Sequence, residues 1–233
     1  MAQKPLRLII GGKWSSTWTM RGWLAVMLSG LPFEEETLFL SRPDSKARLA
    51  EVSPTGRIPV LIDGAVRITD TLAIAEYLWE LAPHSAIWPQ DRLARAAARM
   101  VSAEMHAHFN DVRAALPMNL IKRWPIRNGL PSTVKLLDRP GVRADIARVE
   151  AVWRETRKTW GAGGPYLFGA EFCFADAMFA PMASRFVTYS VPMADDTADY
   201  VEACLHHSYV AQWRAGAEAQ ADDIGRDLVT AFP

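Results

Sequence analysis

The sequence predicts a mixed α/β domain followed by a domain made only of helices. Over roughly the first 80 residues, apolar runs of strand length alternate with segments of helical periodicity, in the order β-α-β-α-β-β-α. A proline-containing segment, residues 83–89, then breaks the periodicity, and nearly every later segment has helical spacing. We therefore expect an α/β domain at residues 1–82, a linker at 83–90 and an all-α domain at 91–233.

The first predicted strand, helix and strand form a crossover unit. Residues 6–10 (LRLII) are a short apolar run ended by two glycines. Hydroxyl side chains at residues 15–17 can cap the following helix, which Gly30 ends. Residues 33–40 can form the second strand, and a short helix is expected near residues 47–52. A crossover of this kind makes the two strands parallel.

The third predicted strand contains a proline inside an apolar run. Residues 58–62 (IPVLI) have strand length, and the Asp63-Gly64 pair predicts a turn into a fourth strand at residues 66–68. Pro59 cannot donate a hydrogen bond to a neighbouring strand. A cis Ile58–Pro59 bond would turn the main chain of Ile58 away from the sheet and leave it free to pair with a peptide-like ligand.

An acid and a hydroxyl residue stand where the next helix begins. Asp70 or Thr71 is the natural N-cap of a helix whose apolar residues extend to Leu81. The unpaired N–H groups of a first helical turn suit a carboxylate, whereas Asp70 suits an ammonium group. Together they can hold a zwitterion such as the head of an amino acid, and plain helix capping is the alternative interpretation.

The remainder of the chain predicts a helical bundle. Apolar residues from Leu93 to Leu116 predict one long amphipathic helix, and a second such helix ends at Gly161. Residues 174–187 are apolar nearly all round, which is typical of the buried centre of a bundle. The spacing i, i+4, i+7 predicts that three polar residues share one helical face. These residues are His106, Asn110 and Arg113.

Composition excludes several classes of function. The 26 basic residues balance 26 acidic ones, which argues against nucleic acid or an anionic membrane surface as the partner. No run approaches the length of a membrane span, and residues 6–10 are too short for a signal-peptide core, so we expect a cytoplasmic protein. Two cysteines, Cys173 and Cys204, make neither a disulfide framework nor a metal site. The expected chemistry is metal-free.

The order of these motifs resembles that of the glutathione S-transferase family. The resemblance is carried by RIPV (57–60), DTLAIAEYL (70–78) and FGAEFCFADAMFAP (168–181), and it covers essentially the whole chain. The segment KWSSTWTMRGWLAVML (13–28) looks most like a bacterial serine-type branch and is similar to the zeta-class pattern S-S-x-x-x-R. The resemblance implies a thioredoxin-like first domain, a glutathione-transferase helical domain and a homodimer.

The resemblance also implies how glutathione, as co-substrate, would be bound. In this family the residue before a cis-proline pairs its main chain with the cysteinyl part of glutathione, and that residue falls on Ile58, before Pro59. The family's acid-then-serine pair falls on Asp70 and Thr71, and threonine keeps the hydroxyl that meets the γ-glutamyl carboxylate. Arg57 can meet a carboxylate or the main chain of glutathione, or it can be a solvated charge.

The resemblance places the catalytic hydroxyl in the first loop. Counting back from Arg21, which matches the family's helix arginine, the first motif serine falls on Ser16, with Thr17 and Ser15 as near-equivalent rivals. A hydroxyl at a helix start favours a bound thiolate because it donates a hydrogen bond at the positive end of the helix. Simple N-capping is the alternative. Further along the chain, Asp176 is expected to accept main-chain hydrogen bonds at the start of its helix.

The second substrate should bind between the first loop and the long helix after the linker. Apolar walls are expected from the tryptophans nearest the first loop and from two residues of the helical domain, while the polar face is expected either to polarise an electrophile or to lie in solvent or a dimer contact. The predicted electrophile pocket comprises Trp14, Trp18, His106, Phe109, Asn110, Arg113 and Met118.

We therefore expect a glutathione S-transferase that directs the glutathione thiolate at small apolar electrophiles, as in detoxification. The sequence leaves open a glutathione-dependent isomerase or dehalogenase, and a non-catalytic binding module with the same fold. No cysteine lies in the first loop, which argues against chemistry through a glutathione mixed disulfide. Glutathione and an electrophile are the expected partners, with no metal, nucleic acid or membrane.

Overall fold

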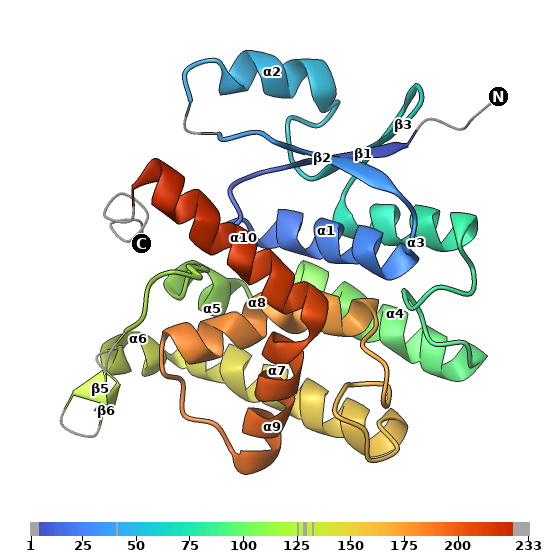
Figure 1. The fold of residues 1–233 in the computed structure, drawn as a ribbon. Helices are drawn as coiled ribbons and strands as arrows, with labels where there is room; N and C mark the ends of the chain where they lie inside the picture. Colours follow the sequence, from blue (N-terminus) through green and yellow to red (C-terminus); the bar gives the residue numbers. More distant parts are fainter. Residues whose placement is uncertain (1–4, 41, 125, 128–129, 132, 226–233) are drawn as a thin grey trace.

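The chain begins with alternating strands and helices (Figure 1). A computed structural model describes residues 5–40, 42–124, 126–127, 130–131 and 133–225. The strands of the first part are β1 (Leu6–Ile10), β2 (Phe33–Thr37), β3 (Val60–Asp63) and β4 (Val66–Thr69), and its helices are α1 (Thr17–Ser29), α2 (Ser45–Val52) and α3 (Thr71–Leu81).

These four strands form one mixed sheet in the order β2-β1-β3-β4. β1 runs parallel to β2, as the crossover through α1 predicts, and antiparallel to β3, which pairs antiparallel with β4. α1 and α3 lie between the sheet and the later helices, and α2 lies on the opposite face (Figure 1). The βαβαββα order confirms the expected thioredoxin-like domain.

The later part of the chain is helical, as expected, apart from one very short hairpin. Strands β5 (Ile126–Arg127) and β6 (Leu130–Pro131) pair antiparallel over two residues each. The helices of this part are α4 (Arg92–Ala107), α5 (Asn110–Ala115), α6 (Val134–Leu137), α7 (Pro140–Trp160), α8 (Phe174–Thr188), α9 (Asp195–His206) and α10 (Ser208–Ile224).

Two predicted strands are shorter in the structure. β2 ends at Thr37 rather than at residue 40, because its partner β1 ends at Ile10, the residue paired with Thr37. β3 begins at Val60 rather than at Ile58, since Pro59 lacks the N–H group that a strand pair requires. Ile58 therefore lies outside the strand.

The prediction of one continuous helix from Leu93 to Leu116 is wrong. α4 ends at Ala107, and Phe109 adopts a left-handed conformation (φ 64°) before α5 begins. The turn buries the Phe109 ring, which packs 6.5 Å from the ring of Phe179. Leu93 is 60% exposed, so the predicted apolar stripe also does not face the core along its whole length.

α8 is the buried centre of the helical part, as its apolar sequence predicts. Asp176 in its first turn is buried, and its carboxylate accepts hydrogen bonds from the main-chain N–H groups of Cys173 and Leu167, each at 3.0 Å, and from the Tyr200 hydroxyl at 3.2 Å. The expected main-chain bonds to Asp176 are confirmed. Burial raises the pKa of Asp176 to about 6, although these hydrogen bonds act in the opposite direction.

Two features are absent from the part of the chain that the structure describes. No helix there has the length and apolarity needed to cross a membrane. Nor do three or more His, Cys, Asp or Glu side chains gather, within the same residues, in a group able to hold a metal ion.

The buried Asp176 should make the stability of the protein depend on pH. Its pKa in the folded state, about 6, exceeds the ordinary value of 3.8, so the folded state binds the proton more tightly. The unfolding free energy should therefore fall as the pH rises from about 4 to about 6, by at most about 3 kcal/mol from this group. An Asp176→Asn variant, which cannot titrate at this position, should lose this part of the pH dependence in urea unfolding.

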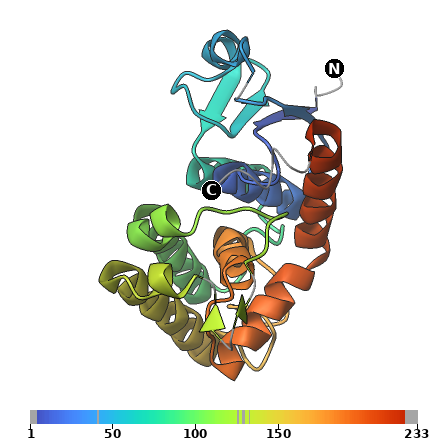
Figure 2. The same ribbon diagram turned by 90° about the vertical axis from the view of Figure 1, so that its left-hand side faces the viewer.

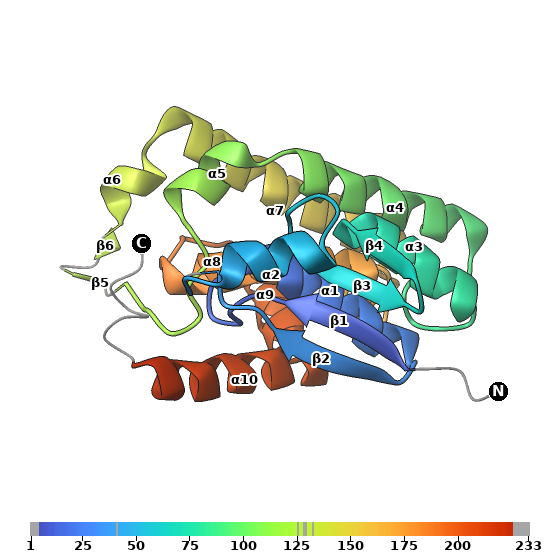
Figure 3. The same ribbon diagram turned by 90° about the horizontal axis from the view of Figure 1, so that it is seen from above.

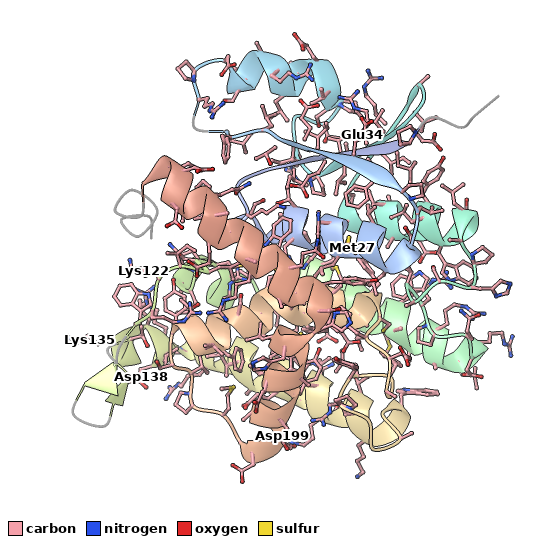
Figure 4. All side chains as sticks on the ribbon, viewed as in Figure 1. Met27, Glu34, Lys122, Lys135, Asp138 and Asp199 are labelled. Carbon is pink, nitrogen blue, oxygen red and sulfur yellow. The ribbon has the colours of Figure 1, made fainter. Side chains whose placement is uncertain are left out.

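The matched control is Asp199→Asn, which changes an exposed carboxylate on α9 (Figure 4). Its unfolding free energy should follow the same pH dependence as that of the unchanged protein. A pH dependence that is equal in all three proteins would contradict the assignment to Asp176.

Candidate functional site

A pocket of about 650 Å³ lies between the two parts of the chain, and we call it the interdomain pocket. Its walls come from the N-terminal end of α1, the loop before β3, the start of α3 and the junction of α4 with α5. The residues that line it are Trp18, Thr55, Arg57, Ile58, Pro59, Thr69, Asp70, Thr71, His106, Asn110 and Arg113.

The interdomain pocket brings together most of the residues that the sequence singled out. The five residues predicted to bind glutathione all line it, and so do four of the seven predicted for the electrophile. Thr55 and Thr69 also line it, and no motif had indicated them. Both residues lie close in the chain to predicted site residues. Thr69 ends β4 just before Asp70, and Thr55 lies two residues before Arg57.

Three predicted wall residues lie elsewhere. Phe109 and Met118 are each only 3% exposed and belong to the hydrophobic core, so the structure corrects their assignment to this pocket. Trp14 also does not line the pocket, because its ring stacks on Phe39 at 6.1 Å. Each side chain gains more from burial against apolar neighbours than from lining an open pocket.

At the start of α3, a buried hydroxyl belongs to a residue that lines the interdomain pocket. Thr71 is 1% exposed, and its Oγ1 atom has no hydrogen-bond partner among the described residues. Asp70 is the N-cap: its Oδ1 atom accepts a hydrogen bond from the Leu72 N–H at 2.8 Å. Both a carboxylate and the positive end of a helix therefore face the same space.

The loop before β3 is held by local hydrogen bonds. The Ser53 hydroxyl accepts from the N–H of Arg57 at 3.0 Å and donates to its carbonyl at 2.6 Å. The Ile58–Pro59 peptide bond is cis. Pro59 approaches α1 closely, since a Cβ atom on Gly22 would lie 2.7 Å from its Cγ atom, and so only glycine fits at that position.

Ser16 stands at the N-terminus of α1. It is the N-cap by backbone position, yet its side chain makes no capping hydrogen bond to the residues that the structure describes. A Cβ atom on Gly11 would lie 3.4 Å from Ser16 Oγ and 2.8 Å from Ile58 Cδ1, so these two side chains meet at Gly11. Ser16 therefore adjoins Ile58, although Ser16 itself is not among the residues that line the interdomain pocket. Thr17 is the first residue of α1, and Ser15 precedes the cap.

The C-terminal helix holds the loop that precedes Ser16, and no sequence signal indicated this. α10 runs alongside α1 and the sheet (Figures 2 and 3). The Lys13 N–H donates to Gln220 Oε1 at 2.7 Å, and its carbonyl accepts from Trp213 Nε1 at 3.1 Å. Lys13 also pairs with Glu35 on β2 at 2.7 Å. Contacts 200 residues apart in the chain cannot be recognised from spacing.

The three polar residues predicted to share one helical face all line the pocket, but they lie on two helices. The turn at His108 and Phe109 breaks the helix, so His106 lies on α4 whereas Asn110 and Arg113 lie on α5. Arg113 donates from Nη1 to the carbonyl of His106 at 3.3 Å, which closes the turn. Burial lowers the pKa of Arg113.

Trp18 is the contact point for several of these side chains. Its ring lies 5.0 Å from that of His106, and the Arg113 guanidinium carbon lies 4.9 Å from its centre. The Arg21 guanidinium carbon lies 4.6 Å from the same ring. A cation over a tryptophan face is attracted by the ring quadrupole, so Trp18 helps to hold two guanidinium groups near one another.

Comparison with known proteins gives the family. Residues 15–81 match the model "Glutathione S-transferase, N-terminal domain". A solved glutathione transferase homologue from Burkholderia gl BGR1, with bound glutathione, is 26% identical, and the match covers 93% of this chain and 100% of that one with a TM-score of 0.68. Residues 15–81 therefore belong to the N-terminal domain of the glutathione S-transferase family, and the whole chain has the fold of these proteins.

Curated relatives of this chain carry two kinds of name. The probable maleylacetoacetate isomerase of Caenorhabditis elegans is 36% identical over 101 residues, which are 43% of this chain and only 45% of that protein. Glutathione S-transferase 1 of Dianthus caryophyllus is 28% identical over 195 residues, which are 78% of this chain and 77% of that protein.

The family model covers only the part of the pocket lining that comes from the first 81 residues. It includes Ser16, the Ile58–Pro59 segment and the start of α3, but it ends at residue 81. His106 and Arg113 lie beyond it, so the tertiary structure, and not the family model, brings them into the interdomain pocket.

Because the Thr71 hydroxyl has no hydrogen-bond partner among the described residues, its removal should not destabilise the unliganded protein. Thr71→Val keeps the shape of the side chain and breaks no hydrogen bond, so the unfolding free energy should stay within about 1 kcal/mol of its original value or rise. The control is Thr133→Val, because the Thr133 hydroxyl donates to the Tyr189 carbonyl at 2.7 Å in a buried site. This control should lose about 1–3 kcal/mol. Equal losses in urea unfolding would show that the Thr71 hydroxyl has a partner.

Proposed function

We propose that this protein binds glutathione in the interdomain pocket and transfers its thiolate to a small electrophile. The observation that carries the proposal is the start of α3, where the buried Thr71 hydroxyl, which has no partner among the described residues, belongs to the residue next to Asp70. A helix start with a free hydroxyl suits the γ-glutamyl carboxylate, and Asp70 suits the ammonium group of the same amino-acid head.

The rest of the tripeptide has a place along the same wall. Ile58 lies outside β3, so its main chain is free of the sheet pairing and can bind the cysteinyl part. Arg57 lines the pocket one residue earlier and supplies a cation for a glutathione carboxylate. The Burkholderia relative, solved with bound glutathione, supports this use of the fold.

Ser16 is the residue that we propose activates the thiol. A free thiol has a pKa near 8.5, so only a few per cent is thiolate at neutral pH. The Ser16 hydroxyl makes no capping bond within the described chain and stands at the positive end of α1, beside Ile58. Lowering the pKa of the thiol by two units requires about 2.7 kcal/mol, which a hydroxyl donor and a helix end can supply together.

The electrophile would then bind against the other wall. Trp18 offers an aromatic face, and Asn110 and Arg113 offer hydrogen-bond donors beside it. In this arrangement the glutathione sulfur attacks an electrophilic carbon, the leaving group departs with its electron pair, and the thioether is released.

Ser16→Ala should reduce activity without removing glutathione. Because the hydroxyl would donate to the sulfur and caps nothing, kcat/KM toward an activated aryl chloride should fall roughly ten- to a hundredfold at pH 7, with glutathione affinity and stability nearly unchanged. The ultraviolet absorbance of the bound thiolate should disappear at neutral pH and return as the pH approaches 8.5.

The same measurements on Ser15→Ala and Thr17→Val test the rival hydroxyls. Full activity in Ser16→Ala together with loss in one of these variants would move the role to that residue. Binding of glutathione with no thiolate absorbance in any of the proteins would favour a non-catalytic binding module.

A glutathione-dependent isomerase is the second candidate, and Arg113 favours it. This guanidinium lines the pocket over Trp18 and would suit an anionic substrate, and several relatives are named maleylacetoacetate isomerase. The two reactions differ in their use of glutathione. A transferase consumes one glutathione for each product, whereas an isomerase returns it, so conversion of maleylacetoacetate with substoichiometric glutathione would identify an isomerase.

A further inference from the structure

His106 makes a contact that joins the helical part of the chain to the start of α3. Its Nε2 atom lies 2.6 Å from Oδ2 of Asp70, although the two residues are 36 positions apart. From the sequence, His106 is expected in the electrophile pocket. In the structure it touches instead the acid that we assign to the glutathione head.

The geometry of this contact leaves Asp70 available to a ligand. An ionised carboxylate only accepts hydrogen bonds, so Nε2 of His106 must be the donor. One oxygen of Asp70 accepts from the Leu72 N–H at 2.8 Å and the other from His106 at 2.6 Å. A carboxylate has about four acceptor sites, and hence about two stay available for an ammonium group. His106 and a ligand can therefore bind Asp70 at the same time.

His106 is held by one contact to its ring and one to its main chain. The ring of Trp18 lies 5.0 Å away, and the carbonyl of His106 accepts from Arg113. The imidazole and carboxylate side chains are 32% and 46% exposed, so both adjoin solvent in the pocket rather than lying in the core. Without His106, the Asp70 carboxylate would be held only by the Leu72 N–H, so it would lose more conformational entropy on binding a ligand.

We propose that His106 is a positioning residue of the glutathione site, orienting the Asp70 carboxylate toward the ammonium group of the γ-glutamyl head. This inference rests on the proposed glutathione binding. It assigns to α4 a function in recognising the co-substrate, in addition to forming the wall of the second-substrate site. It also makes the affinity for glutathione depend on the contact between α4 and α3.

The test compares glutathione with an analogue that lacks only the α-amino group. Isothermal titration calorimetry would measure both ligands with the full-length protein and with its His106→Ala and His106→Gln variants. The alanine variant should bind glutathione roughly tenfold more weakly, because Asp70 is no longer oriented. Its affinity for the analogue should be unchanged, since that ligand has no ammonium group for Asp70.

Two further readouts separate positioning from a general structural effect. His106→Gln keeps an N–H donor near the position of Nε2 and should recover most of the glutathione affinity. In turnover, KM for glutathione should rise in His106→Ala while kcat stays within about twofold, because the residue does not touch the sulfur. The matched control is His84→Ala, an exposed histidine outside the pocket lining, which should behave as the unchanged protein.

The outcomes are distinguishable. Equal weakening of both ligands by His106→Ala, or no weakening of either, would overturn the positioning function while leaving glutathione binding intact. Failure of the unchanged protein to bind glutathione would overturn the proposed function and this inference with it. Selective loss for glutathione, recovered by glutamine, supports the inference.

Discussion

The packing of α1 against α8 is the constraint on which the rest of the structure depends. Arg21 is 1% exposed, and its Nε atom donates to the carbonyl of Met178 at 2.8 Å, directly joining the first part of the chain to the centre of the bundle. Burial, then the neighbouring Arg185 and Arg113, hold the pKa of Arg21 well below its ordinary value. A buried guanidinium is costly unless its donors are paired. The hydrogen bond from Arg21 to Met178 therefore favours one relative position of α1 and α8.

That position determines the interdomain pocket. α1 begins directly after Ser16 and contributes Trp18 to the lining of the pocket. The junction of α4 and α5 lines the opposite side. Because α10 holds the loop at Lys13 and the bundle holds α1, the candidate hydroxyl is supported by elements far from it in the chain. A site assembled in this way can leave a polar group without a hydrogen-bond partner among the described residues, as it does the Thr71 hydroxyl.

Local patterns predicted most elements because periodicity and capping act within a few residues. The strand at Leu6–Ile10, the end of α1 at Gly30 and the cap at Asp70 all follow from nearest neighbours in the chain. The prediction of a continuous helix is wrong at Phe109. Helical spacing carries no information about a turn that is stabilised by packing against a distant aromatic residue, here Phe179. His106, Asn110 and Arg113 do line one pocket, but through that turn rather than through a shared helical face.

The sequence by itself determined the fold class, the family resemblance and the groups that surround the start of α3, since these depend on residue type and short spacing. Only the tertiary structure decided which side chains meet. It buried Phe109 and Met118, brought His106 to Asp70 and placed α10 over the first loop. The physical reason is that burial and hydrogen bonding are satisfied between residues tens to hundreds of positions apart, where the one-dimensional pattern carries no information about contact.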